Sequence, residues 1–260
     1  MKEKMNGEHS LIVGGTKGIG RSVVDLLASQ HHLVSVISRR SPSEPTVQAD
    51  NVYYWTADIT DIKSTLGVLG EIIKKNGKLN HLVFCQRFRG QEDNWTGEIE
   101  TTLTATKRIV EYFVDRFDSN NASIVFVGSI SGSLAVKYAP LAYHVAKGGL
   151  NQLAKYYAVT LGPKNIRVNC VVPGTILKEN SKDFFLKNEE LHTFYKKIIP
   201  LGRMGTANEV ADVISFLCSS KSSFVTGQNI VIDGGVSVQW QEELATRLAA
   251  KGFKSNDQNF

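Results

Sequence analysis

Two side chains, Tyr143 and Lys147, have the types and spacing needed for proton transfer. They lie four residues apart in a segment of good helical propensity, from Ala142 to Leu161, so both side chains leave one face of the predicted helix. An ammonium beside a phenol favours the phenolate electrostatically, which helps the phenol to exchange a proton near neutral pH. A Tyr and a Lys at this spacing are more often a solvated surface pair. The elements around them must decide between these interpretations.

A glycine-rich loop near the N-terminus predicts a phosphate site. Residues 10–13 form a short apolar run, and residues 21–30 follow the loop with apolar side chains at helical spacing. Between them, Gly14 permits a tight turn, Gly18 lets the backbone approach a pyrophosphate, and Gly20 lets the helix pack on the strand. The residues of this loop that we expect to hold a dinucleotide are Gly14, Thr16, Lys17, Gly18, Ile19 and Gly20.

Arginines after the second predicted strand favour one form of the cofactor. The apolar run 33–37 ends in Ser38, Arg39 and Arg40. An acid at this distance from the loop would bind the ribose 2′-hydroxyl, whereas arginine accommodates a 2′-phosphate. Together with Lys17 the two arginines place three cations there, so we predict NADP(H) as the cofactor. Ordinary solubilising arginines at a strand end are the alternative.

The order of apolar runs predicts the fold. Further strands are expected at 52–57, 79–85, 123–127, 166–172 and 229–232, and helices at 61–75, 95–117, 142–161 and 207–219. Strands that alternate with helices in this way indicate an α/β protein with a doubly wound parallel sheet. Asp58 follows the third strand, where it could bind an adenine amino group. Asp58 or Thr60 as a cap for the next helix is an equally good local interpretation.

Serines follow the fifth predicted strand, at Ser129 and Ser131. Serines after a central strand are usually turn formers or helix caps. In a doubly wound sheet, however, the carboxyl ends of the strands are where ligands bind.

The domain organisation follows from composition. We predict one Rossmann-type domain over residues 1–237, with a lid segment at 176–206, and a helical tail at 238–260. The aromatic lid residues Phe184, Phe185, Phe194 and Tyr195 could cover an apolar substrate or pack on one another. Trp240, Leu244 and Leu248 form an apolar stripe in the tail, typical of packing on the domain itself or on a neighbouring subunit.

Charge and composition argue against several other functions. The net charge of +5 is spread along the chain without a basic block that alternates with aromatics, so we expect no nucleic-acid partner. No apolar run approaches the roughly 18 residues that span a bilayer, so we expect no membrane partner and a cytoplasmic location. Cys85, Cys170 and Cys218 lie in or beside apolar runs and fit a reducing compartment. The histidines have no metal-ligand spacing, and we predict no metal site.

Together these residues resemble the short-chain dehydrogenase/reductase family, in particular 3-oxoacyl carrier-protein reductases and related ketone reductases. The likeness covers about residues 10–235. It rests on GxxxGxG at 14–20, Asp58, Ser129, Tyr-x-x-x-Lys at 143–147, Asn-Ile-Arg-Val-Asn at 165–169, Pro173-Gly174, Ile-Pro-Leu-Gly-Arg-Met-Gly at 199–205, Thr-Gly-Gln at 226–228 and Asp-Gly-Gly at 233–235.

The resemblance implies a sheet of about seven parallel strands and a homodimer or homotetramer built partly on the long helices. It implies that Tyr143 donates a proton to a carbonyl oxygen that Ser129 hydrogen-bonds, with Ser131 as the second candidate for that role. Lys147 would assist Tyr143 and hold the ribose hydroxyls. The resemblance adds Ile59, Pro173, Gly174 and Thr175 to the expected cofactor site. The implied substrate is a small or carrier-linked ketone.

Some positions depart from the family pattern. The family's Asn-Asn-Ala-Gly after the fourth strand is Phe84-Cys85-Gln86-Arg87 here, and the helix asparagine that supports a catalytic water falls on Thr102. Two alternatives to a carbonyl reductase therefore stay open. One is a divergent NADP(H)-binding sensor or scaffold, and the other is an enzyme that uses the fold for dehydration or epimerisation.

Overall fold

A seven-stranded parallel sheet forms the centre of the molecule. The structure is a computed structural model, which describes residues 7–41, 50–90, 94–118, 120–177 and 188–249. The strands are β1 (His9–Val13), β2 (Leu33–Ser38), β3 (Val52–Thr56), β4 (His81–Phe84), β5 (Ala122–Val127), β6 (Ile166–Pro173) and β9 (Asn229–Ile232). They pair in the order β3-β2-β1-β4-β5-β6-β9, with every pair parallel. This confirms the predicted doubly wound Rossmann sheet.

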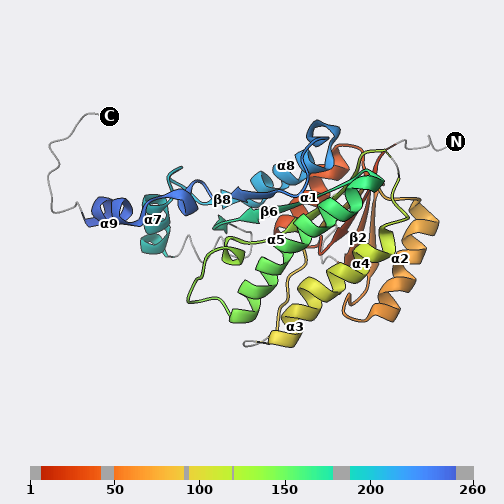
Figure 1. Ribbon diagram of the computed structural model, residues 1–260, viewed down its shortest axis with the longest axis horizontal. Helices are drawn as coiled ribbons and strands as arrows, with labels where there is room; N and C mark the ends of the chain where they lie inside the picture. Colours follow the sequence, from red (N-terminus) through yellow and green to blue (C-terminus); the bar gives the residue numbers. More distant parts are fainter. Residues whose placement is uncertain (1–6, 42–49, 91–93, 119, 178–187, 250–260) are drawn as a thin grey trace.

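Helices cover both faces of the sheet. The main helices are α1 (Gly18–Ser29), α2 (Ile62–Asn76), α3 (Trp95–Ile99), α4 (Ala105–Phe113), α5 (Leu141–Leu161) and α8 (Ala207–Cys218). Figure 1 shows α4 and α5 on one face, with α1 and α8 on the other. Two buried apolar clusters match these faces: one contains Phe113 and Leu150, and the other contains Leu27 and Ile214. Because helices bury both faces, the central strands read as continuous apolar runs.

The strand order reverses between β1 and β4, which are neighbours in the sheet. Gly14 follows β1, and Gln86 follows β4 after Cys85. A Cβ atom on Gly14 would lie 2.7 Å from the Cα atom of Gln86. Only glycine therefore lets the segments after β1 and β4 approach each other this closely. A crevice at such a reversal is the usual ligand site of an open α/β sheet.

Local details differ from the sequence-based prediction. The single helix expected over 95–117 is interrupted by one π-helical stretch, Glu100–Thr104, between α3 and α4, and α4 ends at Phe113. Neither Asp58 nor Thr60 caps α2. Its cap is Asp61, whose side chain accepts a hydrogen bond from the Ser64 amide at 3.2 Å.

The lid and tail segments contribute short elements. Strand β7 (Ile176–Leu177) pairs with β8 (Gly205–Thr206). Helices α7 (Glu189–Ile198) and α9 (Gln241–Ala249) lie together at the end of the molecule opposite the N-terminus (Figure 1). The Gln239 side chain donates to the carbonyl oxygen of Ile198 at 2.7 Å and so ties the tail to α7. Phe184 and Phe185 lie outside the described residues. Among the helices of the described ranges, none has the length and apolar character of a membrane span.

Candidate active site

Tyr143 and Lys147 lie one turn apart near the start of α5. The Lys147 Nζ atom is 5.7 Å from the centre of the Tyr143 ring. Lys147 is only 4% exposed, and its Nζ donates to the carbonyl oxygen of Val127, the last residue of β5, at 2.9 Å. The ammonium is therefore fixed at the carboxyl edge of the sheet. Its other N–H groups have no hydrogen-bond acceptor in the described part of the chain and can bind a ligand.

The Ser129 loop packs directly on α5. Ser129 caps a short 3₁₀ turn, Ile130–Gly132, and its Oγ accepts from the Ser131 amide at 3.2 Å. A Cβ atom on Gly132 would lie 2.7 Å from the carbonyl carbon of Lys147. Glycine is thus required for this close packing, which holds Ser129 beside the start of α5. The Ser129 hydroxyl has no acceptor among the described residues, so its proton can be donated to another oxygen.

A cavity of about 460 Å³ joins these residues to the carboxyl end of β6. Its lining includes Ser129, Ser131, Tyr143, Gly174, Thr175 and Tyr195. The structure therefore brings the expected proton donor together with both candidate serines and with two expected cofactor residues. Within the described part of the chain, no hydrogen-bond partner of the Tyr143 hydroxyl is found.

Arg87 lies at the same cavity. Its guanidinium carbon is 5.6 Å from the centre of the Tyr143 ring, so Arg87 and Lys147 both approach this ring. The neighbouring Gln86 turns toward α4, where its Nε2 donates to the Thr106 hydroxyl at 2.8 Å. The departure from the family pattern after β4 thus places a second cation over the Tyr143 ring.

Thr102 and Glu98 form a buried hydrogen-bonded pair, of which only Thr102 is singled out by the sequence. The Thr102 hydroxyl donates to Glu98 Oε1 at 2.6 Å, and the two residues are 1% and 5% exposed. Glu98 also lines the cavity. In the sequence Glu98 lies in the first helical turn after the cap Asn94. Acids are common there because they interact favourably with the helix dipole. The available signal was the four-residue spacing of Glu98 and Thr102.

The loop after β1 has the form of a phosphate cradle. Gly14 and Gly18 have φ values of +86° and +57°, which strongly favour glycine. A Cβ atom on Gly20 would lie 2.2 Å from the carbonyl oxygen of Gly14, so the helix approaches the loop as closely as the backbone allows. Lys17 is the N-cap of α1, and it makes no side-chain capping hydrogen bond. The first N–H groups of α1 are thus suited to an anion.

Arg39, Arg40 and Asp58 follow β2 and β3, the two strands on one side of β1 in the sheet. Arg39 and Arg40 are exposed directly after β2, which pairs with β1. Asp58 is exposed after β3 and accepts from the amide and hydroxyl of Thr60 at 3.0 and 2.7 Å. These hydrogen bonds lower the pKa of Asp58, and the nearby charge of Arg39 adds to the effect. Asp58 is therefore an ionised acceptor at neutral pH.

The loop before α5 and the helix α7 complete the cavity wall. The Val136 amide donates to Nε2 of His144 at 2.9 Å, so this histidine fixes the loop that carries Tyr138. From α7, Tyr195 hydrogen-bonds the Thr175 side chain. One lid aromatic thus lines the cavity, whereas Phe194 is 48% exposed.

The cysteines are free thiols without a role in this chemistry. Burial raises the pKa values of Cys170 and Cys218 to about 12. Both side chains therefore stay protonated at neutral pH and are poor nucleophiles.

Comparison with known proteins identifies the family. The family model described as enoyl-(acyl carrier protein) reductase matches residues 13–237. A solved structure of a short-chain dehydrogenase family protein from Francisella tularensis superposes with a TM-score of 0.77 at 29% identity, over 90% of this chain and all of that one. The chain belongs to the short-chain dehydrogenase/reductase family.

Other relatives agree with this assignment. The 3-oxoacyl-[acyl-carrier-protein] reductase FabG of Thermotoga maritima is 31% identical over 252 residues, which cover 90% of this chain and 100% of the relative. The solved structure described as ElxO with NADP bound has a TM-score of 0.79 at 28% identity, over 90% of this chain and 100% of that one. The chain is an oxidoreductase of the family, which uses nicotinamide cofactors.

Proposed function

We propose that this protein is an NADP(H)-dependent oxidoreductase that reduces a carbonyl group to an alcohol, or catalyses the reverse reaction. The observation that carries the proposal is the position of Tyr143, which shares a cavity with Ser129 and lies beside Lys147. Bound NADP(H) would supply or accept the hydride at the substrate carbon.

The chain's own residues account for the proton and the developing charge. Tyr143 donates its phenolic proton to the carbonyl oxygen as the hydride arrives. Ser129 donates a hydrogen bond to the same oxygen, because its own oxygen already accepts from the Ser131 amide. Lys147 stabilises the charge that forms on the Tyr143 oxygen and reaches the ribose hydroxyls.

The cofactor would lie across the carboxyl edge of the sheet. The pyrophosphate fits the N-terminus of α1, with Gly14, Gly18 and Gly20 allowing its approach. The 2′-phosphate would meet Arg39 and Arg40, and the structural relative with NADP bound supports this choice. The other residues proposed to contact the cofactor are Thr16, Lys17, Ile19, Asp58, Ile59, Tyr143, Lys147, Pro173, Gly174 and Thr175.

Turnover of a carbonyl panel tests the proposal. The panel would contain small ketones and 3-oxoacyl thioesters, including carrier-linked ones, because FabG of Thermotoga maritima is a relative. We expect NADPH consumption that depends on at least one carbonyl. Tight NADPH binding without turnover would instead favour the sensor or scaffold function, and a product formed without net NADPH oxidation would favour dehydration or epimerisation.

Neutralising the two arginines after β2 should change cofactor preference. We expect Arg39→Gln together with Arg40→Gln to weaken NADPH at least about tenfold more than NADH, since one charge-assisted hydrogen bond contributes about 1.5–3 kcal/mol. Titration of each cofactor by fluorescence measures both dissociation constants. Lys155→Gln, a charge change at an exposed site on α5, is the control. Equal losses for the two cofactors would contradict a 2′-phosphate site.

Removing the second cation beside Tyr143 should slow the reaction. Negative charge grows on the Tyr143 oxygen as the proton leaves, so the cation interacts more strongly with Tyr143 in the transition state than before it. If that gain is about 0.5–2 kcal/mol, the size of a cation–π interaction, Arg87→Gln should lower kcat/KM roughly twofold to thirtyfold. Steady-state kinetics measures this loss, and Arg89→Gln is the matched control because Arg89, unlike Arg87, is not among the residues that line the cavity. An unchanged or higher kcat/KM for Arg87→Gln would show that Arg87 does not assist Tyr143.

We also propose a homodimer or homotetramer and a cytoplasmic location. Val159 and Tyr156 are 78% and 60% exposed on α5, where a second subunit could cover them. The three free cysteines are compatible with a reducing compartment. Light scattering during gel filtration would measure the oligomeric state.

A further inference from the structure

Three residues that are distant in the sequence meet at the amino edge of the sheet. Glu8 precedes β1, His32 precedes β2, and His81 begins β4. These three strands are adjacent and parallel, so their amino ends lie together, opposite the carboxyl edge that carries the active-site cavity. One ligand atom from each residue, a carboxylate oxygen or a ring nitrogen, lies within 4.8 Å of the other two.

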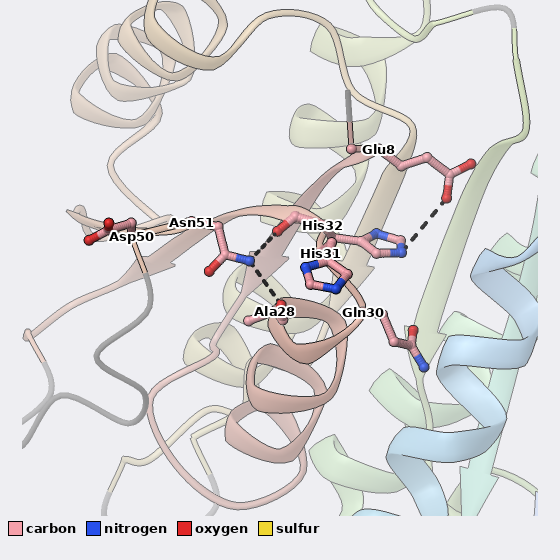
Figure 2. Close-up of a pocket in the computed structure, with 8 residues that line it drawn as sticks. Glu8, Ala28, Gln30, His31, His32, Asp50 and Asn51 are labelled. Atoms are coloured by element: carbon pink, nitrogen blue, oxygen red, sulfur yellow. Dashed lines mark hydrogen bonds and ion pairs between the residues drawn. The ribbon is translucent and has the colours of Figure 1, made fainter. Parts of the chain in front are cut away.

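The separations approach those of a tetrahedral metal site. Glu8 Oε2 is 3.0 Å from His81 Nε2 and 3.7 Å from His32 Nε2. Ligand atoms about 2.0–2.1 Å from a tetrahedral zinc ion are about 3.3 Å apart. Small side-chain shifts would therefore let all three atoms bind one ion. Figure 2 shows the Glu8 carboxylate facing the His32 ring.

Hydrogen bonds orient each of the three side chains toward this point. His32 Nδ1 lies 3.0 Å from the Ser10 hydroxyl, and His81 Nδ1 lies 3.0 Å from the Ser123 hydroxyl. The remaining oxygen of Glu8, Oε1, accepts from the Asn121 side chain at 2.8 Å. In metal sites the second ring nitrogen of a histidine ligand is usually held in this way, which directs the other nitrogen to the ion.

The backbone that carries His32 is also fixed. The Asn51 side chain donates to the carbonyl oxygens of Ala28 and His32 at 2.9 and 2.8 Å, as Figure 2 shows. Asn51 is buried. The end of α1 and the start of β2 are thus joined behind the cluster.

The cluster is open on one side. The His81 side chain is 0% exposed and that of His32 is 12% exposed, whereas the Glu8 side chain is 38% exposed. Glu8 and His32 line a cavity of about 600 Å³, which His31 and Asp50 line as well. An ion can therefore enter past Glu8, and a water molecule or a further ligand can complete its coordination from the cavity.

We propose that Glu8, His32 and His81 bind a divalent transition-metal ion of the zinc type. Two imidazoles and one carboxylate suit Zn²⁺, whereas Mg²⁺ and Ca²⁺ prefer oxygen ligands alone. The site lies away from Tyr143, and the ion would join the starts of three strands that the chain connects only through long crossovers. Binding requires both Nε2 atoms to be unprotonated, and the Ser10 and Ser123 hydroxyls can accept the remaining ring proton.

Zinc titration of the full-length, tag-free, chelator-treated protein tests the proposal. We expect saturable binding of one Zn²⁺ per chain by calorimetry and a rise in Tm that EDTA reverses, with no rise for Mg²⁺. A protein that binds no Zn²⁺ in stoichiometric amount would overturn the proposal and leave the cluster as a hydrogen-bonded polar network.

Variants locate the ion. Glu8→Gln should lower zinc affinity by more than about a hundredfold, because losing an orienting partner alone costs about 10–100-fold. Ser123→Ala removes the partner of His81 Nδ1 and should lower zinc affinity by about 10–100-fold. His192→Gln on α7 is the matched control and should leave zinc affinity unchanged. His32→Asn provides an independent ligand variant if one substitution impairs folding. Unchanged affinity in folded Glu8→Gln and His32→Asn proteins, or an anomalous zinc peak elsewhere in a soaked crystal, would refute the assignment.

Discussion

Replacing Tyr143 by phenylalanine is expected to lower kcat/KM for carbonyl reduction about 10²–10⁴-fold, the range that general acid catalysis contributes. The substitution removes only the phenolic oxygen. The ring keeps its place near Lys147 and Arg87, with centroid distances of 5.7 and 5.6 Å to the two cations in the native chain. NADPH affinity should fall far less than kcat/KM, because the cradle of α1 is untouched and the substitution removes only the contact of the Tyr143 oxygen with the cofactor. Stopped-flow measurement of NADPH oxidation separates the chemical step from cofactor binding.

A matched control removes a phenolic oxygen elsewhere. Tyr53 on β3 packs under Lys75, whose Nζ is 4.2 Å from its ring centre, and it does not line the active-site cavity. Tyr53→Phe should keep the native kcat/KM. Activity of Tyr143→Phe within threefold of the native value would show that another group donates the proton.

Replacing Lys147 by methionine should give the second largest loss, about 10²–10³-fold in kcat/KM, comparable to the loss of one donor that stabilises charge in a transition state. Methionine keeps much of the apolar stem but removes the ammonium, which is buried beside Tyr143. Affinity for NADPH should fall as well, since the proposed contacts to the ribose are lost. Kinetics and cofactor titration measure the two effects.

Loss of Lys147 should also lower the stability of the fold. Lys147 Nζ donates to the Val127 carbonyl oxygen at 2.9 Å, and an unpaired buried carbonyl costs about 1–3 kcal/mol. Thermal unfolding of Lys147→Met should therefore show a lower Tm than the native chain, while Lys155→Met, on the exposed side of α5, should not. A Lys147→Met enzyme with native kcat/KM and native Tm would contradict both assigned roles.

The strands and the glycine loop could be predicted from sequence because their causes are local. Buried parallel strands appear as short apolar runs, and the glycines of the loop are required by backbone conformation, as the φ values of Gly14 and Gly18 show. The pairing of Tyr143 with Lys147 needed only helical spacing. These features are encoded within a few residues of one another.

Other parts of the sites depend on tertiary contacts. The π-helical turn at Glu100–Thr104 is a change in backbone hydrogen bonding that apolar spacing does not signal. Arg87 lies over the Tyr143 ring only because the segment that follows β4 meets the start of α5. The candidate metal ligands do not form a short motif in the sequence. Glu8, His32 and His81 lie far apart along the chain, and only the strand order brings them together.

Transfer of a deuteride tests the central claim most directly. The protein would be incubated with NADPH carrying deuterium on either face of C4 and with the carbonyl panel, and the products would be analysed by mass spectrometry. We predict an alcohol that carries deuterium at the former carbonyl carbon from one labelled form only, formed by the native chain and almost absent with Tyr143→Phe. An unlabelled product from both labelled forms, or equal labelling by the native and Tyr143→Phe proteins, would contradict carbonyl reduction at Tyr143.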